Sequence, residues 1–177
     1  WGHQGKIHNS LSRIPLLVSS PWSSAARITE PVELRGLHDY FHQLASGSGE
    51  MATIQSTGEA LIEYHGLDTQ LGFKPWDTYD GVEADDWNRY QVSLVTEDRR
   101  LWWEAGHEAE LYDPETDPEE RSNLSDAEPE VVRKLQERVR ELVGEPMSLH
   151  RQYRASADDV LEMDNETIQH LENLGYM

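Results

Sequence analysis

The chain has 177 residues, and its charge excludes several classes of partner before any motif is considered. It carries 15 Lys and Arg against 34 Asp and Glu, a formal net charge of −19, so a nucleic-acid backbone or an anionic membrane surface would repel it. Acidic proteins poor in lysine are typical of a salt-rich cytoplasm, where screening removes self-repulsion. We therefore expect a halophilic source, with an ordinary acidic protein as the alternative.

The sequence contains no cysteine. This excludes disulfides and thiolate metal sites and favours a reducing, cytoplasmic compartment. No stretch is long and apolar enough to predict a membrane span. The sequence opens with Trp1 and Gly2 instead of Met, in the middle of what looks like a structural unit, so we expect that the true N-terminus is missing and leave targeting open.

An apolar run at residues 14–18 follows a polar stretch that carries His3, Lys6 and His8. The run is too short for a free-standing helix and ends at the breaker residues 19–21, which predicts a strand buried on both faces of a parallel sheet. A polar loop that leads into such a strand is a common way for an α/β enzyme to present side chains to a ligand. Any catalytic groups are expected here.

Glu30 and Pro31 are a signal for the start of a helix, and the apolar residues that follow them are three and four positions apart. The spacing predicts an amphipathic helix that ends at the Ser and Gly residues of 46–49. Its expected apolar face consists of Leu34, Leu37, Phe41 and Leu44. His38 and His42 have a spacing that can place two imidazoles on one metal, but with no third ligand in sight we interpret them as solvent-facing.

Short β-rich segments and turn signals alternate in the middle of the chain. Residues 60–66 predict a short strand, and 67–87 show no periodicity and predict a loop. The next segments predict an antiparallel meander, with strands at 90–96, 101–104 and 109–112 and turns at 97–100 and 105–108. Trp102 and Trp103 must point to opposite faces, so one is expected in the core and the other at an edge or a neighbouring domain.

The segment 113–124 is rich in Asp, Glu and Pro, and in it Asp117 can cap a turn that starts at Pro118. Pro129 then opens an amphipathic helix that Gly144 and Pro146 end. The ion pairs expected along this helix are Glu130–Lys134 and Arg133–Glu137. A polar link over 148–159 is expected to lead to a last short helix at 165–174.

Several of these segments match a known family when they are taken in order. The matching segments are Gly2-His3, Arg13-Ile14-Pro15-Leu16, the element ELYD…DP.E..NL from Glu110 to Leu124, and the terminal Leu171-Glu172-Asn173-Leu174-Gly175-Tyr176. Together with the helix and the meander between them, they resemble the C-terminal part of the sulfatase family, in the alkaline-phosphatase-like superfamily. The element from Glu110 to Leu124 is the strongest single match.

The resemblance implies an α/β fold of the alkaline-phosphatase-like type. Residues 1–47 would be the end of the parallel-sheet catalytic domain. Residues 48–146 would be a small C-terminal subdomain made of an antiparallel sheet plus a helix. Residues 147–177 would be a polar linker and a terminal helix.

In sulfatases, a formylglycine made from a Cys or Ser in a C/S-x-P-x-R motif attacks the ester beside a Ca²⁺ or Mg²⁺ ion. That motif is missing here, because the nearest match, Ser19 to Ser23, has Ser where the motif needs Arg. The resemblance thus implies that the formylglycine and the metal ligands lie upstream of Trp1. It also implies a small-molecule or glycan sulfate ester as substrate, and it says nothing of the oligomeric state. This chain alone is expected to be inactive.

His3 is the residue that transfers from the family as a catalytic candidate. In relatives the His or Lys after this Gly contacts the ester oxygens or the leaving group, a task that suits a cation or proton donor. Lys6 is a second candidate that requires a register shift. His8 stands where relatives often have Tyr, and Arg13 is interpreted as a structural anchor.

Two other interpretations remain open from the sequence. The complete protein could be a phosphodiester or phosphonate-ester hydrolase or a phosphoryl transferase of the same superfamily, or a non-catalytic domain that lost its active site. Because a buried parallel strand without neighbours leaves backbone and apolar groups uncovered, we expect the isolated chain to be marginally stable.

Overall fold

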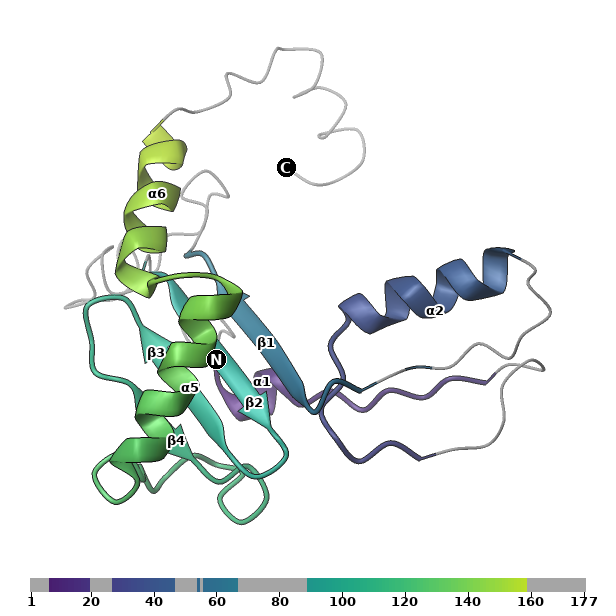
Figure 1. Ribbon diagram of the computed structural model, residues 1–177, viewed down its shortest axis with the longest axis horizontal. Coiled ribbons are helices and arrows are strands. Elements are labelled where there is room, and N and C mark those ends of the chain that lie inside the picture. Colours follow the sequence, from purple (N-terminus) through teal and green to yellow (C-terminus); the bar gives the residue numbers. More distant parts are fainter. Residues whose placement is uncertain (1–6, 20–26, 47–53, 55, 67–88, 159–177) are drawn as a thin grey trace, which may run out of the picture.

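The computed structural model describes residues 7–19, 27–46, 54, 56–66 and 89–158 of the chain (Figure 1). The described helices are α1 (Asn9–Ser12), α2 (Arg35–Ser46), α5 (Pro129–Leu142) and α6 (Pro146–Asp158). The described strands are β1 (Glu59–Tyr64), β2 (Gln91–Thr96), β3 (Arg100–Glu104) and β4 (Glu110–Tyr112).

The strands form one antiparallel sheet in the order β1-β2-β3-β4, so each strand pairs with its neighbour in sequence. This confirms the predicted three-stranded meander and the separate short strand predicted at 60–66, which joins the sheet by pairing with β2. The turn predicted at 97–100 is one residue too long, because Arg100 is already paired with Tyr112 as the first residue of β3. That difference puts the Arg100 side chain on a face of the sheet instead of in a turn.

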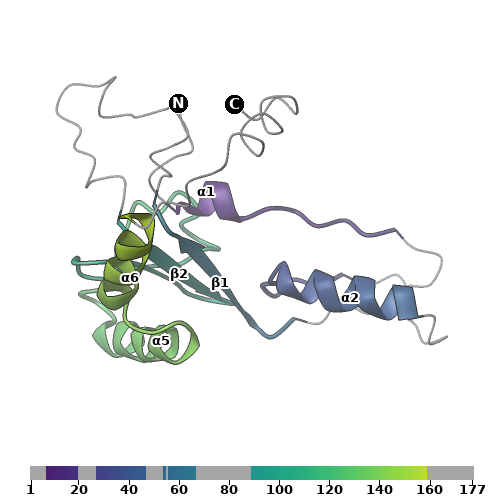
Figure 2. The same ribbon diagram turned by 90° about the horizontal axis from the view of Figure 1, so that it is seen from above.

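One face of the sheet is apolar and packs against α5. Leu94 and Leu101 pair across β2 and β3 and are fully buried, and Trp103 lies in the same cluster with Leu135 and Val139 of the helix. Alternating side chains of a strand point to opposite faces, so the next residues in each strand face the other way. Figure 2 shows α5 on one side of the sheet and α1 on the other.

Trp102 and Trp103 point to opposite faces, as predicted. Trp103 belongs to the core, and its indole nitrogen donates to the His107 carbonyl at 3.2 Å. Trp102 lies on the opposite face and is also buried, with its indole nitrogen donating to Gln91 Oε1 at 3.2 Å. The second face of the sheet is therefore covered as well.

Ion pairs fix α5 against β1 and along its own length. Arg138 donates to Glu59 at 3.0 Å, and this hydrogen bond lowers the pKa of Glu59 below its usual value. Arg133 bonds Glu130 at 2.7 Å and Glu137 at 2.8 Å. The expected Arg133–Glu137 pair is thus confirmed, whereas the carboxylate of Glu130 bonds Arg133 three residues on.

The predicted buried strand at residues 14–18 is wrong for the described structure. These residues have no strand partner there and run as an extended segment away from the sheet (Figure 1). The Ile14 side chain is 72% exposed and Leu17 is 95% exposed. A parallel strand needs hydrogen-bonding neighbours and cover on both faces, and the described residues provide neither.

Two helices also differ from the sequence predictions. The helix predicted from Pro31 begins only at Arg35, and of its expected apolar face Leu34 and Phe41 are exposed while Tyr40 is buried instead. The polar link expected from residue 148 is helical, because α6 begins at Pro146 directly after the end of α5. Pro at the first position suits a helix start as well as it suits a stop signal. The helix predicted at 165–174 and the loop at 67–87 lie outside the described residues.

Matched Leu→Ala changes on α5 test the position of the core. Leu135 is 7% exposed and packs into the cluster, whereas Leu142 at the end of the helix is 38% exposed. We expect Leu135→Ala to lower the free energy of unfolding by about 2–5 kcal/mol through lost burial and a cavity, and Leu142→Ala by clearly less. Urea unfolding of the two variants measures this, and equal losses would contradict the described packing.

Candidate functional site

Two segments about a hundred residues apart in the sequence lie against each other on the second face of the sheet. The leading segment, residues 7–13, contains α1 and follows the sequence candidates His3 and Lys6 directly. The docking loop, residues 113–120, follows β4. Three residues of the leading segment reach main-chain oxygens of the docking loop, so the two segments form one unit.

These contacts come from residues 8, 9 and 13 of the leading segment. His8 Nε2 lies 3.3 Å from the Glu119 carbonyl oxygen. Asn9 Nδ2 donates to the Pro118 carbonyl at 3.1 Å, and Arg13 donates to the Pro114 carbonyl at 3.2 Å. Arg13 thus acts as the anchor that the sequence predicted, on the docking loop and not at a strand entrance.

Arg100 on β3 joins the leading segment to the sheet. Its side chain is fully buried, and its guanidinium donates to the Ile7 carbonyl at 3.1 Å and to Ser12 Oγ at 2.7 Å. Asn9 Oδ1 lies 3.4 Å from the same group. One planar group with five N–H donors therefore holds both ends of α1.

Glu120 supplies the charge that this buried guanidinium requires. Its carboxylate is 2.9 Å from Arg100 Nε and 3.3 Å from His8 Nε2, and its side chain is only 6% exposed. Burial lowers the pKa of Arg100, and the charge of Glu120 opposes that shift. An arginine stays protonated even when it is buried, so the guanidinium is a buried cation beside the Glu120 carboxylate.

The backbone of Glu120 is left-handed, with a φ of 52°. A non-glycine residue in this region costs about 1–2 kcal/mol. The loop keeps this conformation where it turns the Glu120 carboxylate toward Arg100. The strain therefore lies at the point where the docking loop meets the sheet.

Gln91 on β2 extends the same contact at its other end. Its Oε1 accepts hydrogen bonds from the Ile7 amide at 3.0 Å and from the Trp102 indole at 3.2 Å. Both Gln91 and Ile7 are buried. The start of the leading segment is thus tied to two strands through side chains of one face.

Side chains of the loop hold the docking loop itself in shape. Asp113 accepts the amides of Glu115 and Thr116, each at 2.9 Å. Asp117 accepts the amides of residues 121 and 122 at 3.1 and 2.8 Å, beyond the turn at Pro118 that it was predicted to cap. Asn123 likewise accepts the amides of residues 111 and 125. Asp113, Asp117 and Asn123 of the ELYD…NL element therefore have a structural role, because they hydrogen-bond backbone amides in and beside the loop.

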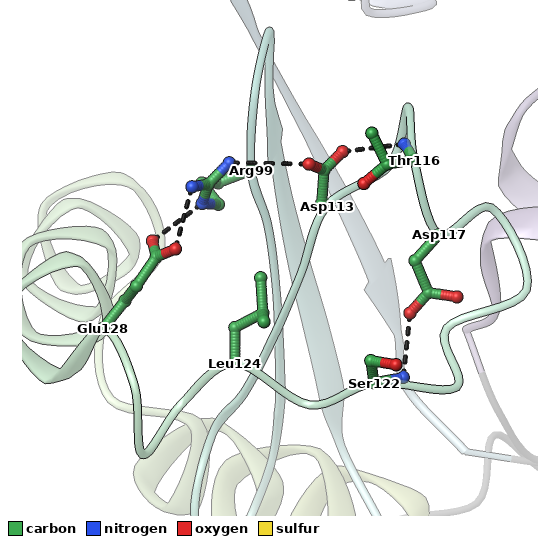
Figure 3. A pocket seen from close by; sticks show the side chains of 7 residues that line it. All are labelled: Arg99, Asp113, Thr116, Asp117, Ser122, Leu124 and Glu128. Carbon is green, nitrogen blue, oxygen red and sulfur yellow. Dashed lines mark hydrogen bonds and ion pairs between the residues drawn. The ribbon is translucent and has the colours of Figure 1, made fainter.

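A pocket of about 400 Å³ opens beside this loop (Figure 3). Its lining consists of Arg99, Asp113, Thr116, Asp117, Ser122, Leu124 and Glu128. Figure 3 shows Arg99 between two carboxylates; it bonds Glu128 twice at 2.8 Å and lies 3.9 Å from Asp113. The charged groups of this pocket are occupied by one another or by loop amides, which is the pattern of a structural junction between loop and helix.

The sequence candidates fall in different places. His3 and Lys6 lie outside the described residues, immediately before the leading segment. His38 and His42 are exposed on α2, with ring centroids 6.3 Å apart. Within the described ranges no group of three or more His, Cys, Asp or Glu side chains is arranged to hold a metal ion.

Sequence reasoning missed Arg100, Glu120 and Gln91. The available signal was that Arg100 directly precedes the strand residues Leu101 to Trp103. If the strand starts one residue earlier, Arg100 lies on a face of the sheet. The sequence could not say that residues 7–12 would cover that face.

Comparison with protein-family models found no match, and neither the curated proteins nor the solved structures gave one. In the part of the chain that the structure describes, no helix has the length and apolar character needed to cross a membrane.

Asp113 gives a pH test of the docking loop. The hydrogen bond from the Thr116 backbone amide, with further ones from Thr116 and Glu115, lowers the pKa of Asp113. A lowered folded-state pKa stabilises the protein above the unfolded-state value of about 4, and that stability is lost as the pH falls through the folded-state pKa.

Asp113→Asn keeps a carbonyl acceptor but cannot titrate. We therefore expect it to be less stable than the wild type at pH 7 and to approach the wild type below about pH 4. Urea unfolding at several pH values measures the difference between the two proteins. A difference that does not change with pH would show that the Asp113 charge has no role in the loop.

Proposed function

We propose that this chain is the C-terminal part of a sulfatase-type hydrolase and that its described residues hold the loop that carries His3. The supporting observation is a contact between residues 8–13, which lie between and at the edge of the two matching segments at the start of the sequence, and the docking loop, which lies within the match from Glu110 to Leu124. The hydrogen bonds from His8, Asn9 and Arg13 to the docking loop make this contact.

The arrangement suits the positioning of a catalytic side chain. A group that acts on a reacting ester must be held to within about 0.5 Å by neighbours that are themselves fixed. Residue 7 is four positions after His3, and its amide and its carbonyl are both bonded to buried side chains of the sheet. The segment that follows His3 is thus anchored at its first described residue.

Under this proposal His3 contacts the sulfate oxygens or the leaving-group oxygen. An imidazolium there would stabilise developing negative charge or donate a proton to the leaving group. Lys6 is the alternative cation in the same loop. The formylglycine nucleophile and the Ca²⁺ or Mg²⁺ ion that the resemblance implies would be held by residues outside this sequence, and the substrate would be a small-molecule or glycan sulfate ester.

The test uses the complete gene product, including any residues that precede Trp1, with 4-nitrophenyl sulfate as substrate. We expect His3→Ala to lower kcat/KM by about ten- to a thousand-fold, as for the loss of a general acid or an oxyanion donor. Lys6→Ala should have a smaller effect. The matched control is His38→Ala on the exposed face of α2, which should leave kcat/KM unchanged.

Parallel assays with bis(4-nitrophenyl) phosphate and 4-nitrophenyl phosphate separate the alternatives. Hydrolysis of a phosphate ester without hydrolysis of the sulfate would replace the proposal by phosphodiester or phosphoryl-transfer chemistry. Failure to hydrolyse any of the three esters would point to a non-catalytic protein. A sulfate hydrolysis rate that is unchanged in both His3→Ala and Lys6→Ala would remove this loop from the active site.

A further inference from the structure

We propose that His38 and His42 on α2 form a two-imidazole site for a late first-row transition-metal ion such as Zn²⁺ or Ni²⁺. The two residues are four positions apart in a helix of twelve residues. Side chains at this spacing are neighbours on one helix face, with about 5–6 Å between their Cβ atoms. The site goes beyond the proposed function and is separate from it, because no ester and no residue of the leading segment takes part.

The two imidazole rings lie close to each other and are open to solvent. Their centroids are 6.3 Å apart and their planes are inclined by 24°. The His38 side chain is 79% exposed, and His42 is also exposed. Two nitrogens that are each about 2.0–2.1 Å from one ion lie about 3 Å from each other, so both rings must turn toward a common point. Exposed side chains change rotamer within nanoseconds, which makes this adjustment available to them.

Asp39 prepares one of the two rings for a metal ion. Its Oδ1 is 3.2 Å from His38 Nδ1. A carboxylate can only accept a hydrogen bond, so Nδ1 carries the hydrogen and Nε2 keeps the lone pair that binds a metal. Histidine ligands of metal sites commonly donate their second ring nitrogen to a carboxylate in this way. This contact distinguishes the pair from two unrelated surface histidines.

The donor set selects the class of metal ion. Imidazole nitrogen suits Zn²⁺, Ni²⁺ and Cu²⁺, whereas Ca²⁺ and Mg²⁺ prefer oxygen ligands. The part of the chain that the structure describes offers no group of three or more possible ligands, so the other coordination positions would be filled by water or by a molecule that binds to the ion. A net charge of −19 raises the local concentration of cations around the chain. The site is therefore open and of moderate affinity.

A metal ion bound by both rings would join two successive turns of α2. Figure 1 and Figure 2 show this helix to one side of the sheet, away from α5 and α6. Of its residues only Tyr40 is buried, and Phe41 is 59% exposed, so most of the helix surface faces solvent. An ion that binds only the helical form stabilises that form by mass action. We therefore expect zinc to slow amide exchange in α2.

The test measures amide hydrogen exchange by mass spectrometry in the complete gene product with and without ZnCl₂, in buffer free of other transition metals. It compares the wild type with His38→Ala and His42→Ala. A shifted pair, His42→Ala combined with Gln43→His, keeps the number of histidines but places them five positions apart. The matched control is His107→Ala. It removes an exposed imidazole that also lies near a carboxylate, Glu104 at 3.5 Å, but has no histidine four positions away.

We expect an apparent Kd for zinc of about 1–100 µM, because two ligands supply about half of the binding free energy of a four-ligand zinc site. At ten times this Kd, zinc should slow exchange in residues 36–46 of the wild type about tenfold. His38→Ala, His42→Ala and the shifted pair should each weaken binding by about tenfold or more, and Asp39→Asn by up to about tenfold. His107→Ala should respond to zinc as the wild type does.

Zinc protection of residues 36–46 that survives in both His38→Ala and His42→Ala would overturn the proposal, because the ion would then be bound elsewhere. Wild-type exchange in α2 that does not respond to about 1 mM zinc would overturn it as well, and so would equal protection by CaCl₂. Each protein is compared with itself in the absence of zinc, so a change in helix stability caused by the substitution cancels. None of these outcomes depends on hydrolysis of a sulfate ester.

Discussion

The described structure depends on one buried guanidinium. Taking a charged group out of water costs several kcal/mol unless it is paired and hydrogen-bonded. The partners of Arg100 come from two segments about a hundred residues apart, and its Nε is ion-paired with Glu120 at 2.9 Å without the geometry of a hydrogen bond. Glu120 balances the charge, and Ile7 and Ser12 take up N–H groups. Removal of any one segment would leave the others with unpaired polar groups. The interaction therefore couples the position of the leading segment to the second face of the sheet.

The two faces of the sheet are consequently held by different interactions. The face against α5 is held by apolar burial, which tolerates small shifts and has no preferred direction. The face against the leading segment is held by hydrogen bonds with fixed geometry through Gln91 and Arg100. The directional contacts fix the position of the leading segment on the sheet, whereas the apolar contacts hold α5 against the other face. The left-handed backbone of Glu120 fits this division, because a strained residue persists where the surrounding contacts determine its position.

Local signals in the sequence predicted the elements well and their long-range contacts poorly. The meander could be predicted from the alternating apolar residues Val92, Leu94, Leu101 and Trp103 and from the turn residues between the strands. The helix α5 could be predicted from Pro129 and the stripe of Val and Leu residues that follows it. The buried strand predicted at residues 14–18 was wrong, because burial depends on neighbours that no local pattern reveals. Arg100 was placed in a turn because a charged pair next to Asp98 favours a turn, and only the contact with residues 7–12 explains an arginine facing inward. The stretch with His3, Lys6 and His8 was selected from its position before an apolar run, but a specific role for His3 came only from the family resemblance, since a lone histidine in a loop carries no pattern of its own.

A double-mutant cycle between Arg100 and Ser12 tests this account most directly. The free energies of unfolding of the wild type, Arg100→Met, Ser12→Ala and the double variant would be measured in urea. The cost of leaving Glu120 unpaired is present in both Arg100→Met proteins and cancels in the cycle. The account predicts a coupling energy of about 1–2 kcal/mol, as expected for a half-buried hydrogen bond to a charged group. Losses that add to within about 0.5 kcal/mol would contradict it, because the leading segment would then be held by something other than Arg100.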